Sequence, residues 1–418
     1  MNRSTLPQNF STANPHVLAV ILQASETQAI LASRDIFDIS GTKLWARDQP
    51  VSQALQRKLL DRQLRQPLET CLQAEHGVTA HTLVESLAAL LERDGTLSLL
   101  LRPHGARLLR EATQLPLHSV VQLLLTVGRA ARPESFDHAV QAMALNGVLA
   151  IAHGAAAPEL RQAMLCGLLH DLGEIYIAPE HGEADAERTL DFQSYKHLVV
   201  HPHVGQLLLQ QLTDYPAAVA RAIGEHHERL DGSGYPHCLQ REQISAQGRQ
   251  LAVTEAVLGS LRSQGATLAR ASVALRVVPG EFDLRCVGAV SAASRLQPPL
   301  QPTMTADQIP KRLALLDASL HTAHVGIVAL ASVAQSQALM DALTLAQQLL
   351  ARLRTGWNAS GLWINGHEAA QDAAEVEAVE QELRRRLRGI HRAILLHAGK
   401  LPAGDLKSLN LLGEQLGS

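Results

Sequence analysis

Histidines and carboxylates with spacings suited to metal binding are concentrated in the middle of this 418-residue chain. The densest stretch is His226–Pro236, where two adjacent histidines precede a carboxylate, an arginine and a glycine-rich turn. A neutral imidazole is the commonest nitrogen ligand for a metal, and Gly and Pro allow a tight loop beside a site. Upstream, the same residue types occur as His170-Asp171 after an apolar run, as His201, and as His138 four residues after Glu134. Mixed imidazole and carboxylate ligands suit Fe, Mn or Zn.

The order of these elements carries more weight than any one of them, because a single histidine is more often a surface or core residue than a ligand. The order and approximate spacing resemble those of the HD-GYP domain, a branch of the HD metal-dependent phosphohydrolases. The matching elements are Glu134 and His138, His170-Asp171, His201-Pro202 with Gly205, His226-His227-Glu228 through Gly234-Tyr235-Pro236, and Gly248 through Glu255. The resemblance covers roughly residues 120–300.

The resemblance implies a polynuclear site that holds two or three divalent ions. Its predicted ligands are Glu134, His138, His170, Asp171, His201, His226, His227 and Glu255. Paired ions lower the pKa of a bridging water and clamp phosphate oxygens, which is what hydrolysis of a phosphodiester requires. Asp171 is the expected catalytic residue, together with that water, because its two oxygens allow it to bridge two ions. Glu255 stands at a position where the family usually has an aspartate ligand. Glu134 matches the family's glutamate ligand, so the site could hold a third ion.

Residues around the predicted ligands receive supporting roles from the same resemblance. We expect four of them to contact the substrate, namely Gly234, Tyr235, Arg249 and Arg262. Two neighbours of the histidine pair, Glu228 and Arg229, would hold the ligands in place, as groups around a metal site commonly do. Asp231 would fix the loop.

Three departures from the family pattern concern the surroundings of the substrate, and two of them reduce the positive charge expected there. Glu174 replaces the lysine of the family's HDxGK motif, and Leu258 replaces a second aspartate. The basic segment that usually follows is missing, and only Arg262 lies near its position. If Glu174 faces phosphate, the reversed charge costs a few kcal/mol. It could instead be a further metal ligand, which is the less favoured interpretation.

Helices are predicted to carry every candidate ligand, as in rigid metal sites. Pro133 is typical of a first helical position and opens the helix of Glu134 and His138. The other predicted helices span residues 159–169, 189–211, 217–228 and 247–261. The fold class is therefore mainly α, with a helical bundle of the HD type.

The predicted organisation has five parts. They are a disordered N-terminus at 1–15, a mixed or helical module at 16–115, an HD-GYP domain at 116–297, a proline-rich linker at 298–310 and a helical region at 311–418. Alternation around Ser40-Gly41 predicts a β-hairpin in the module, followed by helices near 52–64 and 68–115. Beyond the linker we expect helices at 310–350 and 368–397, which favour an interaction module over a second catalytic domain.

Composition limits the classes of partner. The formal net charge is −3, and basic residues are interspersed with acids, so we expect no nucleic-acid binding. Four widely spaced cysteines, and an N-terminus with no apolar signal core, favour a cytoplasmic protein. No apolar run reaches the ~18 residues of a membrane-spanning helix.

Two functions remain open. The first is a phosphodiesterase that hydrolyses the bacterial second messenger cyclic di-GMP to pGpG or GMP. The alternative is a degenerate member that binds cyclic di-GMP or protein partners without hydrolysis. The preserved ligands favour the enzyme, whereas the three departures favour the alternative. In either case we expect signalling proteins to contact the N- and C-terminal regions, and the sequence leaves a homodimer open.

Overall fold

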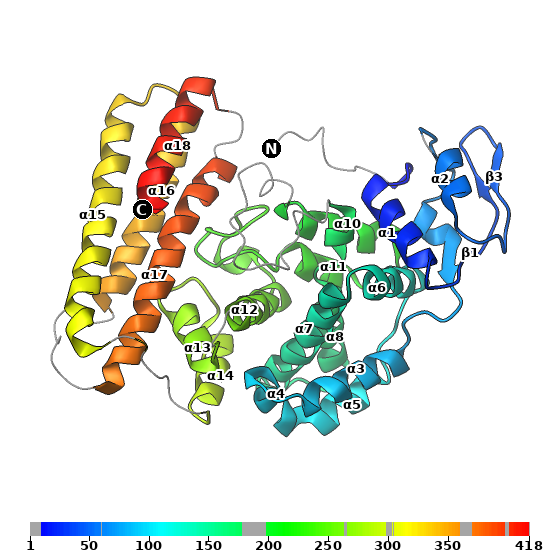
Figure 1. Ribbon diagram of the computed structural model, residues 1–418, viewed down its shortest axis with the longest axis horizontal. Coiled ribbons are helices and arrows are strands. Elements are labelled where there is room, and N and C mark those ends of the chain that lie inside the picture. Colours follow the sequence, from blue (N-terminus) through cyan, green and yellow to red (C-terminus); the bar gives the residue numbers. More distant parts are fainter. Residues whose placement is uncertain are drawn as a thin grey trace.

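The computed structural model describes residues 10–59, 61–177, 198–262, 266–297, 303, 305–359, 370–397 and 401–417. The chain is mainly helical, with small sheets near the N-terminus and a helical bundle at the C-terminal end (Figure 1). Within the described part of residues 120–300, β-structure is limited to one isolated bridge between Asp231 and Gln240. The predicted mainly α fold is therefore confirmed.

Two small antiparallel sheets form in the N-terminal part. The elements are α1 (Pro15–Ser25), β1 (Ile30–Ala32), β2 (Ile36–Phe37), β3 (Lys43–Trp45), α2 (Gln53–Leu59), the 3-10 helix η1 (Leu68–Cys71) and β4 (Leu72–Ala74). Strands β2 and β3 pair as the predicted hairpin, with Gly41 at φ 86° in its turn. Strand β1 pairs with β4 inside the span predicted as helix from residue 68. Local patterns do not reveal this pairing, because the two strands are far apart in the sequence.

Packing begins at Phe10, inside the segment predicted to be disordered. Residues 1–9 of that segment lie outside the described residues. The ring of Phe10 meets Tyr176 edge-on at a centroid distance of 5.5 Å. The Asn14 side chain caps α1 by accepting the His16 backbone N–H at 2.9 Å, which satisfies a donor at the helix start.

A set of packed helices forms the central part. They are α3 (Ala80–Glu92), α4 (Thr96–Leu101), η2 (Arg102–His104), α5 (Gly105–Ala112), α6 (Ser119–Ala131), α7 (Pro133–Ala152), α8 (Ala157–Leu169), η3 (Leu172–Tyr176), α10 (His201–Leu212), α11 (Ala217–Gly224), η5 (Arg241–Gln243), α12 (Ala246–Leu261), α13 (Leu268–Arg276) and α14 (Leu284–Ser294). Helices α7 and α8 approach closely at Gly167, where an added Cβ would lie 2.4 Å from the Ala142 carbonyl oxygen. Only glycine permits this contact.

One hydrophobic core joins the N-terminal part to the central helices. Its buried residues run from Phe10 to Val290 without a break at the predicted boundary after residue 115. Leu108 of α5, for example, packs directly over Gly147 of α7, where an added Cβ would lie 2.7 Å from a Leu108 methyl carbon. The described residues from Phe10 to Val290 therefore share one core across the boundary predicted after residue 115.

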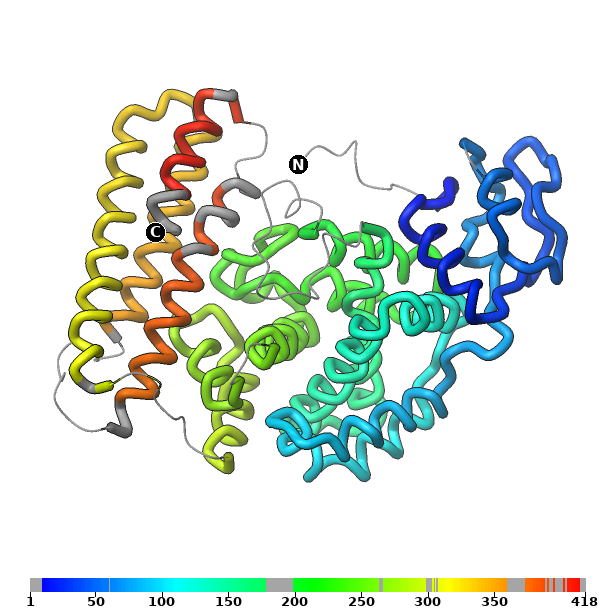
Figure 2. The backbone as a smooth tube through the Cα atoms, in the orientation of Figure 1, coloured from blue at the N-terminus to red at the C-terminus, as the bar shows by residue number. Residues whose placement is uncertain are grey.

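The C-terminal helices form a bundle with a second core. The bundle comprises α15 (Ile309–Val333), α16 (Gln337–Ala359), α17 (Ala370–His397) and α18 (Ala403–Gly417), preceded by η6 (Ala306–Gln308). It stands beside the central helices, with α17 packed on α13 (Figures 1 and 2). The long helices were predicted, α18 was not, and η6 and α15 begin inside the predicted linker. Of that linker, residues 298–302 and 304 lie outside the described residues.

Helix α15 is the one described helix that is long and apolar enough to cross a membrane. The sequence was predicted to contain none. Length and composition alone do not distinguish a spanning helix from a bundle helix. In this structure α15 packs against α16, α17 and α18.

Candidate metal centre

Helices and helix ends bring seven of the eight predicted ligands together. The seven are His138 on α7, His170 and Asp171 directly after α8, His201 as the first residue of α10, His226 and His227 just after α11, and Glu255 on α12. Helix α11 ends at Gly224, four residues before its predicted end, so the histidine pair lies in a turn. The first part of the helix predicted at 189–211 lies outside the described residues, and α10 begins at His201.

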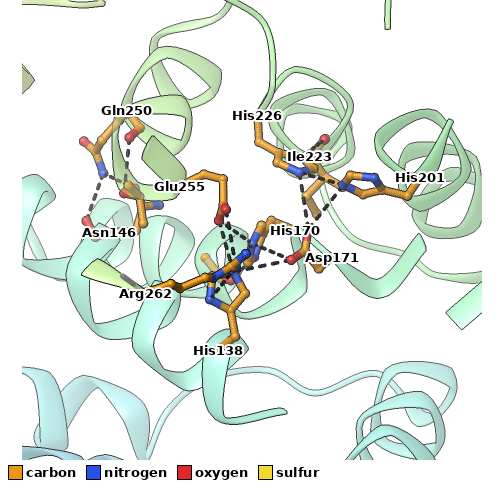
Figure 3. Close-up of polar contacts among 12 residues, drawn as sticks. His138, Asn146, His170, Asp171, His201, Ile223, His226, Gln250, Glu255 and Arg262 are labelled. Atoms are coloured by element: carbon orange, nitrogen blue, oxygen red, sulfur yellow. Dashed lines mark hydrogen bonds and ion pairs between the residues drawn. The ribbon is translucent and has the colours of Figure 1, made fainter. Parts of the chain in front are cut away.

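Asp171 lies between two groups of ligands and contacts both (Figure 3). Its Oδ2 lies 3.0 Å from His170 Nε2 and 3.4 Å from His138 Nε2. Its Oδ1 lies 3.3 Å from His201 Nε2 and 3.4 Å from His226 Nε2. The two oxygens of one carboxylate thus face two separate sets of imidazoles, which is the arrangement a bridging ligand needs.

The two groups differ in composition. In the mixed group (His138, His170, Asp171 and Glu255), Glu255 Oε2 lies 3.0 Å from His138 Nε2 and 3.2 Å from His170 Nε2. In the three-histidine group (Asp171, His201, His226 and His227), Asp171 supplies the carboxylate. Ligand-capable atoms within each group lie within 4.8 Å of one another, so each group could surround a single ion.

Backbone carbonyls set the tautomer of three imidazoles. The Nδ1 atoms of His170, His201 and His226 lie 2.8, 2.7 and 2.6 Å from the carbonyl oxygen three residues earlier in each case. A carbonyl only accepts, so each Nδ1 must carry the proton and donate it. The Nε2 lone pairs then face Asp171 and are free to bind a metal.

Electrostatics differ between the two groups. Burial lowers the pKa of His226 to about 4 and that of His227 well below its usual value. Burial also opposes charge on His138 and His170, but the carboxylates of Asp171 and Glu255 outweigh it, so the pKa of each histidine is raised. Burial would raise the pKa of Asp171 and Glu255, yet the surrounding imidazoles hold both well below the ordinary carboxyl value.

The residues present fit a pair of divalent ions. Among the described residues Asp171 Oδ1 is buried and accepts no hydrogen bond, although a buried carboxylate oxygen normally has a partner. An ion between Asp171 and each group of imidazoles would satisfy that oxygen, and the imidazole–carboxylate set suits Fe, Mn or Zn. His138, His170 and Glu255 would hold one ion, His201, His226 and His227 the other, and Asp171 both.

Glu134 and Glu174 belong to neither group. Glu134 is exposed on the first turn of α7, and Glu174 is buried on η3. Both instead line an open cleft of about 500 Å³ that also exposes His138, Asp171 and Arg262. The cleft is therefore the route from solvent to the mixed group, and its wall carries the acidic residue that replaces the family's lysine.

The predicted substrate-binding arginines lie in different places. Arg262 Nη2 lies 3.0 Å from His138 Nε2 and 3.5 Å from Glu255 Oε1, at the cleft (Figure 3). Arg249 instead donates from Nε to the Ile244 carbonyl at 2.9 Å, on the first turns of α12 and away from the cleft lining. Leu258, at the family's second aspartate position, is buried in the main core.

Several contacts hold the loop after the histidine pair together. Tyr235 stacks on His227 at a centroid distance of 4.5 Å. A Cβ added at Gly234 would lie only 2.4 Å from the His227 carbonyl oxygen, so this position requires glycine. Glu228 accepts the backbone N–H groups of His237 and Leu239 at 2.7 and 2.8 Å. Asp231 accepts the Ser233 N–H at 3.0 Å, and Arg229 donates to the Glu228 carbonyl at 2.9 Å. The loop is thereby fixed against the three-histidine group.

A hydrogen-bonded network beneath the mixed group was not predicted. Asn146, buried in the middle of α7, accepts Thr254 Oγ1–H at 2.9 Å, and its backbone carbonyl accepts Gln250 Nε2–H at 2.9 Å. The network ties α7 to α12, the helices of His138 and Glu255 (Figure 3). An asparagine within an otherwise apolar helical run was the available signal. A second missed feature is Gly173, where an added Cβ would lie 2.0 Å from the His201 carbonyl oxygen.

Comparisons with known proteins concern the central helices. Residues 124–275 match the family model of the HD domain. Cyclic di-GMP phosphodiesterase PA4108 of Pseudomonas aeruginosa is 34% identical over 122 residues, which cover 29% of this chain and 29% of that protein. The 3'3'-cGAMP-specific phosphodiesterase 1 of Vibrio cholerae is 29% identical over 137 residues, covering 33% of this chain and 31% of that protein.

A third relative has a similar extent. Cyclic di-GMP phosphodiesterase response regulator RpfG of Xanthomonas campestris pv. campestris is 33% identical over 151 residues, covering 34% of this chain and 39% of that protein. The chain thus spans less than two fifths of the length of these three relatives. Among solved structures, Bd1817, a HDG"Y"P protein from Bdellovibrio bacteriovorus, aligns with 64% of this chain and 96% of that one, at 16% identity and a TM-score of 0.36.

Proposed function

We propose that this protein is a metal-dependent phosphodiesterase of the HD-GYP type, because residues 124–275 match the HD domain. We further propose that its substrate is cyclic di-GMP, which it hydrolyses to pGpG, to GMP or to both. The HD-domain relatives with phosphodiesterase names support the class of reaction. Two of those reported above are named for cyclic di-GMP and one for 3'3'-cGAMP, which supports a cyclic dinucleotide as substrate.

The observation that carries the proposal is the position of Asp171 between two ligand groups. One carboxylate oxygen faces the imidazoles of His138 and His170, and the other faces those of His201 and His226. A structural ion pair has no need of imidazoles on both sides of one carboxylate. When bound, two divalent ions there would acidify a water and neutralise charge on the phosphate.

The chain's own residues would position the substrate at the cleft. Arg262 is fixed beside His138 and Glu255, where its guanidinium could donate to a non-bridging phosphate oxygen. Carbonyl contacts keep the histidine rings oriented, and the stacked Tyr235 covers one face of His227. Fixed ligands of this kind reduce the reorganisation that the reaction would otherwise require.

Binding without hydrolysis is the second candidate function, and Glu174 favours it. This glutamate and Glu134 both line the cleft through which a dianionic dinucleotide would enter. Leu258 lies in the core, so this chain has no carboxylate at the family's second aspartate position. Such a protein would keep its ions as a structural platform and act through its ligand-bound state.

A hydrolysis assay on metal-loaded, anaerobically purified protein separates the two functions. We expect cyclic di-GMP to be converted to pGpG or GMP, with about two ions per chain by elemental analysis. Binding of cyclic di-GMP with no product after prolonged incubation would exclude the enzyme and leave the second function.

The matched control is the double variant His170→Ala with Asp171→Ala. It should lose metal and turnover together while its circular dichroism keeps the helical signal, because both side chains point into the site and not into the main core. Turnover that survives in this variant would show that the activity arises elsewhere.

A further inference from the structure

A second cavity, separate from the open cleft, lies between the His226–Pro236 loop and the C-terminal bundle. Its volume is about 190 Å³. The loop contributes His227, Arg229 and Tyr235, the bundle contributes residues of α16 and α17, and Glu281 also lines the cavity. The cavity lies where the main hydrophobic core meets that of the bundle, and α13 contributes residues to both cores.

Arginines dominate the charge of this cavity. Arg229, Arg352, Arg385 and Arg386 line it, against two carboxylates, Asp231 and Glu281. A third carboxylate, Glu382, stands outside the lining and binds Arg385 and Arg386 along α17. The lining therefore has an excess of positive charge.

Both carboxylates of the lining already form ion pairs with arginines. Asp231 receives Arg352 Nη1 at 3.0 Å, and Glu281 Oε1 receives Arg386 as well as Arg229 at 3.6 Å. Two guanidinium groups thus share one oxygen of Glu281. The other oxygen, Oε2, is buried and has no hydrogen-bond partner among the described residues. The cavity consequently offers spare donors on the arginines and one spare acceptor.

We propose that this cavity binds a small phosphorylated molecule that also carries a hydroxyl group, as a nucleoside monophosphate does. A phosphate presents oxygens to several guanidinium groups at once, the pairing for which arginine is best suited. A ligand hydroxyl would donate to Glu281 Oε2. Leu349 and Leu353 provide an apolar wall for the rest of the molecule.

Occupancy of the cavity would reach the candidate metal centre through the loop. Tyr235 lines the cavity and stacks on His227, and the Asp231–Arg352 ion pair fastens the same loop to α16. A bound phosphate would compete with Asp231 for Arg352 and loosen that fastening. The cavity is thus a regulatory site whose existence does not depend on hydrolysis at the metal centre.

Calorimetric titration of the full, metal-loaded chain with GMP and with inorganic phosphate tests the proposal. Arg385→Ala should weaken GMP binding about tenfold or more, since this exposed arginine pairs only along its own helix. Arg384→Ala is the matched control, because Arg384 pairs with Glu380 and does not line the cavity. Its affinity should equal that of the wild type. A twofold or smaller difference between the two variants would overturn the proposal.

A second pair of variants at Gly389 does not alter charge. Gly389 is on the cavity rim, and an added Cβ there meets no atom within 4 Å. Gly389→Leu should block binding, whereas Gly389→Ala should leave most of it. Asp171→Ala separates the two sites: if it abolishes the binding heat while Arg385→Ala leaves it intact, the anion sits on the metals and the proposal fails. Inorganic phosphate should bind more weakly than GMP if the hydroxyl contact with Glu281 contributes.

Discussion

The two ligand groups that share Asp171 are built from different chemistry. The mixed group sets two imidazoles against two carboxylates and opens onto the cleft, whereas the three-histidine group is buried and depends on Asp171 alone for negative charge. Glu255 helps raise the pKa of His138 and His170, while burial, reinforced by neighbouring imidazoles, lowers the pKa of His226 and His227. An ion in the mixed group would therefore carry less net charge and lie nearer the substrate.

The difference suggests a division of labour between the two ions. Neutral imidazoles around the buried position leave most of the ion's charge unscreened, which favours acidification of a shared water. The mixed position, where carboxylates would partly neutralise the ion, would face the substrate phosphate that we propose to bind beside Arg262. Asp171 couples the two positions, and its removal should have the largest effect on the centre.

Replacement of Asp171 by asparagine should break both groups at once. The amide keeps the shape of the side chain but cannot bridge two cations, so we expect both ions to be lost. Hydrolysis of cyclic di-GMP should fall at least ~1,000-fold, the equivalent of about 4 kcal/mol. Elemental analysis and product chromatography measure the two effects. Retention of two ions per chain in Asp171→Asn would contradict the bridging role.

Single histidine replacements should separate the groups. We expect His226→Ala to lose the ion of the three-histidine group and His138→Ala to lose that of the mixed group, each retaining about one ion per chain. Loss of a direct ligand should weaken metal affinity more than loss of a group that only orients a ligand, which typically costs ~10–100-fold. If either variant lost both ions, the groups would not be independent and the comparison would fail.

The same two variants allow the pH dependence of each group to be measured alone. A raised pKa means that His138 and His170 hold a proton at a pH where an ordinary histidine has lost it, and a metal must displace that proton. Affinity of the mixed group should therefore fall as pH drops from 8 to 6, by roughly tenfold per pH unit for each proton displaced. The three-histidine group, with His226 at a pKa of about 4, should change little over that range. The metal affinity of each variant is measured by competition with a chelator at several pH values. Equal slopes of affinity against pH for the two groups would contradict the expected difference.

The smallest expected effect concerns Glu174, which lies outside both groups. Glu174→Lys should lower the KM for cyclic di-GMP about threefold to tenfold, as a charge change worth about 1 kcal/mol at a partly screened site would. Metal content should stay unchanged, and Glu174→Gln should give an intermediate KM. A lower metal content in Glu174→Lys would instead identify Glu174 as a ligand and extend the mixed group.

Much of the candidate site was predicted from the resemblance to the HD-GYP domain, in which the ligands occur in a fixed order along the chain. The apolar run before His170-Asp171 and Pro133 before Glu134 then placed two of the helices that carry them. Placement of Arg249 was not accessible, since its identity suggested phosphate binding while its position on α12 directs it to the Ile244 carbonyl. Convergence of Asp171 on two groups depends on helix crossings that no local pattern records.

The fold was predictable where periodicity was strong and unpredictable where distant segments meet. The β2–β3 hairpin has its own turn and was predicted, whereas the β1–β4 pairing joins segments about 40 residues apart. Packing across the boundary predicted after residue 115 was also not visible in the sequence. The boundary was placed where the segment with the predicted ligands begins. Leu108, which precedes this boundary, nevertheless packs onto Gly147, which follows it.

The continuous core from Phe10 to Val290 determines which segment of the chain can be exchanged between proteins as one unit. A segment that began at residue 116 would leave the apolar faces of α6 and α7 without α1, α3 and α5, and would expose them to water. We therefore expect a segment that folds around the candidate centre to start near α1 and not at α6. New input segments would disturb this core least if they were joined before residue 10 or after α14.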